Sequence, residues 1–226
     1  MTGTTYKLSP SDFAYLWEEC KFCYVQKVKY GVSYSGPFPA MFGKINTLLQ
    51  NSIMGLNLRD IIPGLPSGVI SVQEGYLASI VVPGTKCYLK GRFDILSLLE
   101  DGTYALIDFK ITSPDDGKIL KKYATQLHAY KFALENPQMG TPLKISQMGV
   151  VSINPDSMKL EGGKVIFTTT PTWHPIEEDM DGFYALIKDI SQVLSESDPA
   201  SAPTCTLCIY RGKFGPRLPV TDEIPF

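Results

Sequence analysis

Two segments decide the fold of this chain, Gly91-Arg92-Phe93-Asp94 and Ile107-Asp108-Phe109-Lys110. Each lies in a run rich in Val, Ile, Leu, Tyr and Phe that is bounded by turn residues, and such runs predict β-strands at 87–99 and 103–111. A third run of the same character covers 69–82. The three runs follow one another closely, so we expect an antiparallel meander.

The turn between the second and third runs sets their register. A three-residue loop that ends at Gly102 pairs Leu99 with Thr103, and the last position of such a loop takes left-handed backbone, which glycine adopts without strain. In this register Asp94 lies directly opposite Asp108. A two-residue turn would instead place the two carboxylates on opposite faces of the sheet, where they could not share a ligand.

The three-residue loop predicts a cluster of charges on one face of the hairpin. Directly opposed residues have Cβ atoms roughly 5 Å apart, so Asp94 and Asp108 could bind one hard cation such as Mg²⁺ or Mn²⁺. Lys110 shares their face, and Arg92 is expected opposite Lys110. The alternative interpretation is that these residues form cross-strand ion pairs on an exposed face of the sheet.

Further elements surround this meander. Helical spacing of apolar residues and strand-like runs predict four helices and two more strands. The helices are expected at about 9–30, 40–54, 117–135 and 176–194, and the strands at 144–154 and 164–170. This order predicts a mixed α/β (α+β) fold with a central mixed sheet flanked by helices, in a single domain over residues 1–226.

Four of the five cysteines form two pairs with the same spacing, Cys20 with Cys23 and Cys205 with Cys208. Four thiolates can hold zinc or an iron-sulfur cluster, and the spacing does not distinguish the two. Either group would join the first helix, at about 9–30, to the C-terminal tail, at about 199–226. The alternative is that Cys20 is a small buried hydrophobe and the other three are incidental. Cys87, in a strand, is expected to be packed in the core.

A third motif, Gln126-Leu127-His128-Ala129-Tyr130, lies on the helix after the meander. The set Gly-x-x-Asp, Asp-x-Lys and Gln-x-x-x-Tyr, in this order, resembles the PD-(D/E)XK nuclease superfamily, in particular its RecB-like branch. The resemblance covers about residues 69–135 and implies a restriction-endonuclease-like fold. Its three motifs are specific as an ordered set, whereas the two carboxylate motifs by themselves are weak.

The resemblance also implies a role for each residue of the motifs. Asp94 and Asp108 would bind the metal with the backbone carbonyl of Phe109, and Lys110 would orient or activate the attacking water. The two remaining motif residues, Gln126 and Tyr130, would position this site or the nucleic-acid backbone. Phosphodiester hydrolysis needs a cation that neutralises developing charge and makes hydroxide available near neutral pH, and the carboxylate pair suits that requirement.

The sequence departs from the family pattern in two places. RecB-like enzymes usually carry a histidine ligand on an upstream helix, and the matching stretch here, Gly43-Lys44-Ile45-Asn46, has Asn46 in its place. Some members, including the CRISPR-associated exonucleases, hold a four-iron four-sulfur cluster with one N-terminal and three C-terminal cysteines. This chain has two and two, so the resemblance implies such a cluster, with structural Zn²⁺ as the alternative.

The expected function is a metal-dependent DNase that acts on ends or single strands in repair, recombination, phage or defence pathways, with DNA and possibly a helicase as partners. The formal net charge of −2 does not favour nucleic-acid binding, but basic residues gather at 110–131 and 211–217. Two alternatives remain, an inactive nucleic-acid-binding protein of the same fold and a cysteine-metal interaction module. No signal peptide or membrane segment is present, so a cytoplasmic location is expected.

Overall fold

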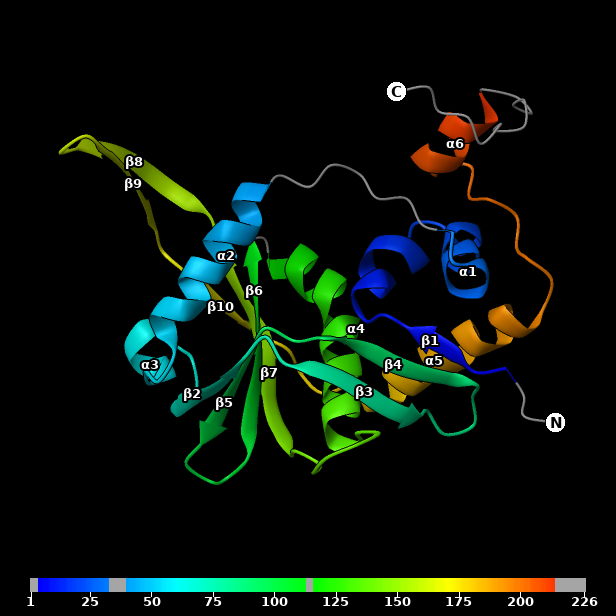
Figure 1. Cartoon of the computed structure of the whole chain (residues 1–226), viewed down its shortest axis with the longest axis horizontal. Coiled ribbons are helices and arrows are strands. Elements are labelled where there is room, and N and C mark those ends of the chain that lie inside the picture. Colours follow the sequence, from blue (N-terminus) through cyan, green and yellow to red (C-terminus); the bar gives the residue numbers. More distant parts are fainter. Residues whose placement is uncertain (1–3, 33–39, 113–115, 214–226) are drawn as a thin grey trace, which may run out of the picture.

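The computed structural model of the chain describes residues 4–32, 40–112 and 116–213. Its elements form mixed sheets flanked by helices, as the sequence predicts (Figure 1). A five-stranded sheet lies at the centre, and helices cover both of its faces. A smaller three-stranded sheet and a protruding two-stranded hairpin complete the strands of the described residues.

The central sheet has the strand order β10-β7-β6-β5-β2. Its strands are β2 (Gly68–Gln73), β5 (Ile95–Leu99), β6 (Tyr104–Ile111), β7 (Ile145–Ile153) and β10 (Thr172–Pro175). The pair β6 and β7 is parallel, and the other neighbours are antiparallel. A parallel pair needs a crossover, which helix α4 (Asp116–Glu135) provides between the two strands. This arrangement places α4 directly after the strand that carries Asp108.

The smaller sheet has the strand order β1-β4-β3, and the protruding hairpin pairs β8 with β9. These strands are β1 (Tyr6–Leu8), β3 (Tyr76–Val81), β4 (Cys87–Arg92), β8 (Pro155–Glu161) and β9 (Lys164–Thr169). Strands β1, β8 and β10 were not predicted from the sequence. The predicted runs 69–82 and 87–99 are each divided into two strands, because the hairpin that they form bends sharply in the middle.

The bend lies where Glu74 and Gly75 face Phe93 and Asp94. Glu74 has left-handed backbone, with φ of 49°, and a Cβ atom on Gly75 would lie 2.1 Å from the Phe93 ring. The chains stay hydrogen-bonded through the bend, from Glu74 N to Asp94 O at 2.7 Å and from Phe93 N to Gly75 O at 3.0 Å. The hairpin thus begins in one sheet and ends in the other, and Asp94 lies at their junction.

The predicted first helix, at about 9–30, is wrong as one continuous element. It is divided into a π-helical turn, η1 (Phe13–Trp17), and α1 (Lys21–Tyr30), because Cys20 between them is extended. The other three predicted helices are present, with ends that move by a few residues, and two short helices are added. The remaining helices are α2 (Ala40–Ile53), α3 (Leu58–Ile61), α5 (Met180–Ser195) and α6 (Thr206–Gly212).

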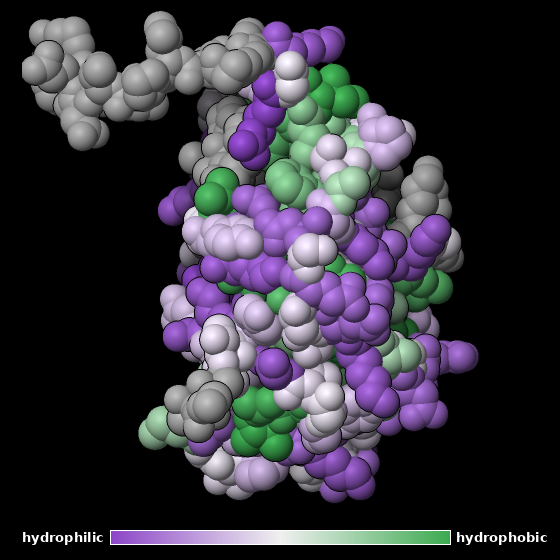
Figure 2. Space-filling view, turned by 90° about the vertical axis from the view of Figure 1, so that its right-hand side faces the viewer, coloured by the Kyte–Doolittle hydropathy of each residue, from purple (hydrophilic) through white to green (hydrophobic). Residues whose placement is uncertain are grey.

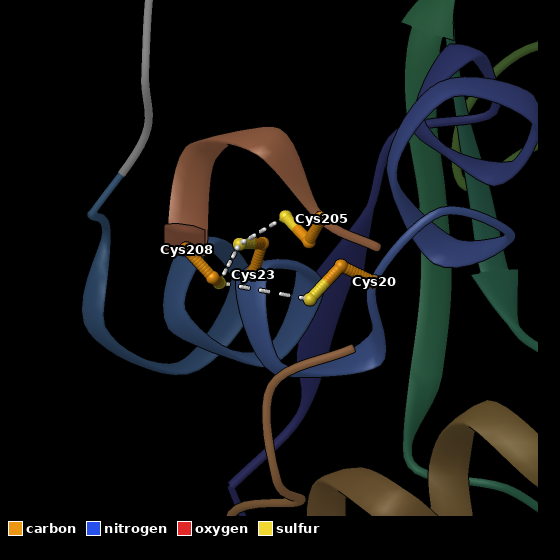
Figure 3. Close-up of side chains that lie close together, drawn as sticks. All are labelled: Cys20, Cys23, Cys205 and Cys208. Atoms are coloured by element: carbon orange, nitrogen blue, oxygen red, sulfur yellow. Dashed lines mark hydrogen bonds between the residues drawn. The ribbon is translucent and has the colours of Figure 1, made fainter. Parts of the chain in front are cut away.

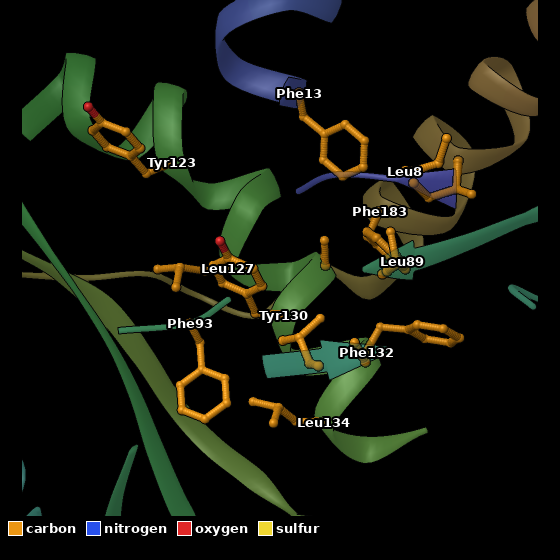
Figure 4. Close-up of a cluster of buried hydrophobic side chains, with 14 of the residues drawn as sticks. Leu8, Phe13, Leu89, Phe93, Tyr123, Leu127, Tyr130, Phe132, Leu134 and Phe183 are labelled. Atoms are coloured by element: carbon orange, nitrogen blue, oxygen red, sulfur yellow. The ribbon is translucent and has the colours of Figure 1, made fainter. Parts of the chain in front are cut away.

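Hydrophobic cores lie on both faces of the central sheet. On one face, α2 and α3 cover odd-numbered residues of β5 and β6 such as Ile95 and Ile107. On the other face, α4, α5 and the smaller sheet cover the even-numbered residues Leu96 and Leu106. Figure 4 shows part of this second core, where side chains from η1, α4, α5, β1 and β4 meet. Asp108 is even-numbered and therefore faces α4.

The outer surface is mostly polar on the side where α1 and α5 lie, as Figure 2 shows. Exposed apolar side chains gather instead on one face of the β8–β9 hairpin, where Met158 pairs with Phe167 and Leu160 with Val165. Among the helices of the described residues, none combines the length and apolar character needed to cross a bilayer.

Candidate active site and cysteine cluster

The register of the hairpin is the one that the three-residue loop predicts. Leu99 N donates to Thr103 O at 2.9 Å, and Gly102 has left-handed backbone with φ of 78°. Along the strands Ile95 pairs with Ile107, so Asp94, one residue earlier, comes opposite Asp108. The two carboxylates therefore meet at the end of β5, beside the bend between the two sheets.

Backbone and lysine contacts hold both carboxylates in place. Asp94 Oδ2 accepts a hydrogen bond from Phe109 N at 3.0 Å, and Asp108 Oδ2 lies 2.5 Å from Lys110 Nζ. Asp108 is buried, with 2% of its surface exposed. The N–H and C=O of one strand residue point toward the same edge. The carbonyl of Phe109 therefore points toward the same side as Asp94.

The third motif is brought to the same place. Gln126 Nε2 lies 3.4 Å from Asp108 Oδ1 and 3.1 Å from Tyr130 Oη, and it donates to both. The amide oxygen of Gln126 is buried without a hydrogen-bond partner among the described residues. Unpaired buried polar atoms are rare in folded proteins and often mark a site that takes a water or an ion. All five predicted side chains of the site thus lie in one cluster.

The charges in this cluster shift one another's protonation. Burial, together with the neighbouring charge of Asp108, raises the pKa of Asp94 to about 7. Burial disfavours the Lys110 ammonium, but the carboxylates of Asp108 and Asp94 outweigh it and raise the pKa of Lys110 above its ordinary value. Burial raises the pKa of Tyr130 to about 12. Lys110 is therefore an ammonium near neutral pH. Ionisation of Asp94 is disfavoured, because it would add a negative charge beside Asp108 in a buried site.

The expected position of Arg92 opposite Lys110 is wrong. Arg92 ends β4 in the smaller sheet, where it pairs with Tyr76, and its Nη1 lies 3.3 Å from Glu74 Oε2. The bend at Glu74 separates β4 from β5, so the pairing of the central sheet does not extend to Arg92. The site consequently contains one basic side chain from the hairpin instead of two.

Helix α2 carries the residue at the position of the family histidine. Asn46 is partly buried on this helix, and Gln50, one turn later, is completely buried. Neither amide atom of Gln50 has a hydrogen-bond partner among the described residues. The same helix packs Ile53 into the core that holds Phe109. Gln50 is a polar residue that the sequence analysis missed, because glutamine on a helix carries no signal of burial.

The two predicted basic patches are smaller than expected. Lys131 is buried, and its Nζ lies 2.7 Å from Glu135 Oε1 and 3.1 Å from Glu178 Oε2, so it adds no charge to the surface. Lys121 and Lys122 are exposed on α4. In the C-terminal patch, Arg211 and Lys213 are exposed, and Arg217 lies outside the described residues.

The four paired cysteines lie together, as the sequence predicts (Figure 3). The Sγ atom of Cys23 is 3.8 Å from that of Cys205 and 3.4 Å from that of Cys208, and Cys20 Sγ is 3.9 Å from Cys208 Sγ. All four sulfur atoms lie within 4.8 Å of one another, so the cluster could hold a metal ion. Cys87 is fully buried in the hydrophobic core, away from this cluster.

Both cysteine pairs use the same local structure. Cys20 and Cys205 each cap the N-terminus of a short helix with extended backbone, and Cys23 and Cys208 lie in the first turn of those helices. The N-terminus of a helix carries partial positive charge, which favours thiolates. Two helix N-termini therefore face one another through four sulfur atoms, and α6, in which no residue is buried, is attached to α1 there.

The thiols of this cluster differ in their acidity. Burial raises the pKa of Cys23 above its ordinary value and that of Cys208 to about 11. For Cys20, burial is outweighed by hydrogen bonds from the backbone of Ala202 and Cys23, which lower the pKa to about 7. Of Cys20, Cys23 and Cys208, Cys20 is thus the first to become a thiolate. Metal binding needs deprotonated cysteines and releases their protons.

Comparisons with known proteins add little to this geometry. No family model matches the chain, and no curated protein matches it. A solved structure described as "Crystal structure of SSO0001" aligns over 85% of this chain and 78% of its own, with 16% sequence identity and a TM-score of 0.47. A similarity at this level carries no functional argument, so the interpretation of the site rests on its own residues.

Proposed function

We propose that this protein is a metal-dependent nuclease that hydrolyses phosphodiester bonds of DNA. One observation carries the proposal: Asp94 and Asp108 lie opposite one another with Lys110 and Gln126 in contact with Asp108. Burying two carboxylates, an ammonium and an amide together costs free energy of desolvation. Such clusters therefore occur most often at functional sites. The resemblance to the PD-(D/E)XK superfamily gives each of these groups a role.

The site fits Mg²⁺ or Mn²⁺ by the character of its donor atoms. Asp94, Asp108 and the carbonyl of Phe109 offer hard oxygen ligands, which both ions prefer. The raised pKa of Asp94 and the unpaired amide oxygen of Gln126 are two signs of a cluster that lacks positive charge. A cation bound there would neutralise charge on the phosphate and lower the pKa of water.

The side chains of the chain divide the remaining tasks. Lys110 is protonated, so it orients the attacking water and stabilises negative charge on the phosphate rather than accepting a proton. Gln126 fixes the Asp108 carboxylate by its amide N–H and keeps its oxygen for water or an ion. Tyr130 supports Gln126 from the next turn of α4. These contacts hold the acid pair in one orientation before substrate arrives.

The proposal is tested by cleavage assays on single-stranded, duplex and flapped DNA with Mg²⁺ and with Mn²⁺. We expect Lys110→Ala to lose at least about 100-fold in rate, because it removes preorganised positive charge next to the reacting phosphate. Lys121→Ala is the matched control, since it removes an exposed lysine of α4 and we expect it to cleave like the wild type. Equal activity of Lys110→Ala and Lys121→Ala contradicts the proposal.

A second candidate is a nucleic-acid-binding protein that does not cleave. Asn46 supports it, because an amide oxygen binds a divalent cation more weakly than imidazole binds Mn²⁺. This candidate predicts salt-sensitive binding to DNA and no metal-dependent cleavage by the wild type in any of the assays above. A helicase partner and a role in repair, recombination, phage or defence pathways stay predictions for either candidate.

We further propose that the cysteine cluster holds one tetrahedral ion such as Zn²⁺. Zinc-sulfur bonds of about 2.3 Å place tetrahedral thiolates roughly 3.8 Å apart, and the sulfur separations of 3.4, 3.8 and 3.9 Å are close to that value. An iron-sulfur cluster needs more room, because each thiolate binds a different iron atom. Anaerobic purification tests this: colourless protein with one zinc per chain agrees with it, and brown protein with iron contradicts it.

A further inference from the structure

An aromatic and basic strip leads from the candidate active site to the surface. Lys110 Nζ lies 5.2 Å from the centroid of the Tyr123 ring, and Tyr123 Oη lies 2.8 Å from Tyr15 Oη. Lys122 Nζ lies 4.0 Å from the centroid of the Tyr15 ring and 5.8 Å from that of Tyr123. The four side chains thus form one continuous series of contacts that begins at the lysine of the acid pair.

Exposure increases along this strip. Tyr123 is buried, with 5% of its surface exposed, whereas Tyr15 is 44% exposed and Lys122 is exposed. No carboxylate of the described residues forms an ion pair with Lys122. The outer end of the strip therefore presents an aromatic ring with accessible area and an exposed ammonium that forms no ion pair with a described carboxylate, within two side chains of Lys110.

Rigid elements hold the strip in position. Tyr15 projects from η1, whose neighbouring residues Phe13 and Trp17 are buried in the core (Figure 4 shows Phe13). Tyr123 and Lys122 come from α4, the helix that also supplies Gln126 to the site. Because both elements are anchored, the exposed ring keeps a fixed position relative to the acid pair instead of moving with a loop.

We propose, building on the nuclease function above, that Tyr15, Lys122 and Tyr123 form the entry path for single-stranded nucleic acid, with a base stacked on Tyr15 and a phosphate against Lys122. Every base has a π-face, so stacking on tyrosine is independent of sequence, and an adjacent lysine binds the backbone. A duplex hides its base faces and cannot use the ring in this way. The strip thus selects single strands and delivers their phosphates to Lys110.

Binding without cleavage tests this path, by fluorescence anisotropy in EDTA with a short labelled oligo-dT, its oligo-rU counterpart and an abasic oligonucleotide of the same length. We expect Tyr15→Ala to bind the base-containing strands about tenfold more weakly and the abasic strand like the wild type. Tyr15→Phe keeps the ring and is expected to bind like the wild type. Lys122→Ala lowers the slope of log affinity against log salt by about 0.7.

Tyr30→Ala is the matched control, because Tyr30 is also exposed beside a lysine, with Lys29 Nζ 6.0 Å from its ring centroid, but lies at the far end of α1. Equal affinity of Tyr15→Ala and Tyr30→Ala overturns the path, as does a wild type that binds no single strand. If the wild type binds in a Tyr15-dependent way but never cleaves, the nuclease proposal fails and the binding path stands. Equal binding of oligo-dT and oligo-rU assigns the path to both nucleic acids.

Discussion

The substitution Asp94→Asn separates the stability of the candidate active site from its function. The folded pKa of Asp94, about 7, lies above its ordinary value of 3.8. The folded state therefore binds this proton more tightly than the unfolded state, and the contribution of Asp94 to folding falls as the pH rises from about 4 to 7. Above pH 7 the ionised carboxylate destabilises the metal-free protein, and asparagine removes that effect while keeping an oxygen for Phe109 N.

The size of the effect follows from the same two values. Their difference corresponds to at most about 4 kcal/mol, and we expect roughly half of it, because the Asp94 side chain is only partly buried and the site relaxes. For a chain of this length, 2 kcal/mol corresponds to a rise in Tm of about 4–8 °C. We therefore expect metal-free Asp94→Asn to melt that much higher than the wild type at pH 8, and to melt like the wild type near pH 4.

Differential scanning calorimetry in EDTA measures the stability of the metal-free protein, and the same measurement in Mn²⁺ measures how much the bound metal stabilises it. Saturating metal raises the Tm of the wild type at pH 8, because the ion binds the folded state alone, and leaves Asp94→Asn unchanged. Glu161→Gln, which removes one exposed negative charge on β8, is the charge-matched control and is expected to resemble the wild type. If Asp94→Asn melts below the wild type at pH 8, or still responds to Mn²⁺, the account of this carboxylate is wrong.

Three further substitutions test other parts of the structure. Gly75→Ala introduces a Cβ atom 2.1 Å from the Phe93 ring at the bend of the hairpin; we expect urea unfolding to show a loss of about 1–3 kcal/mol, and an unchanged midpoint contradicts the bend. Lys131→Met removes the buried ammonium that Glu135 and Glu178 contact, and since both acids keep access to water we expect a loss of about 1–2 kcal/mol, whereas a loss below the error of the titration contradicts a stabilising role for Lys131. Cys205→Ser removes one ligand of the cysteine cluster; we expect loss of the bound metal and faster proteolysis within α6, and full metal content in this variant argues against the site.

The register of the hairpin was predictable, because it depends on local chemistry. Gly102 is the residue that a three-residue loop requires, and the side-chain alternation of strands then fixes Asp94 opposite Asp108. The third motif was equally predictable, since Gln126 and Tyr130 lie four residues apart, which is about one turn of a helix. Residues whose neighbours are set by short-range geometry could therefore be assigned from the sequence.

The bend and the second sheet were not predictable, because they depend on tertiary contacts. Glu74 takes left-handed backbone although glutamate rarely does, and the strand-like residues on either side of it hide the break. Cys20 interrupts the first helix for a similar reason: its sulfur lies in the cysteine cluster, which forms only when the tail returns. Strand β1 is too short to be recognised without its partner β4.

The strip of Tyr15, Lys122 and Tyr123 beside the candidate active site could not be predicted from the sequence either. Tyr15 and Tyr123 are 108 residues apart in the sequence, and their hydroxyl contact follows from the packing of η1 on α4. Each tyrosine alone is an ordinary helix residue. What the sequence does contain is the ordered set of motifs, which indicates the position of the candidate active site but not the path that we propose for its substrate.

The most direct test of the central claim is the cleavage rate of end-labelled single-stranded DNA by wild type and by Asp108→Asn over a titration of Mn²⁺. The Asp108 carboxylate contacts both Lys110 and Gln126. Asparagine removes the negative charge of this carboxylate while keeping the size and shape of the side chain. We predict cleavage by the wild type that requires Mn²⁺ and falls at least about 1,000-fold in the variant. Cleavage by Asp108→Asn at the wild-type rate would contradict the account.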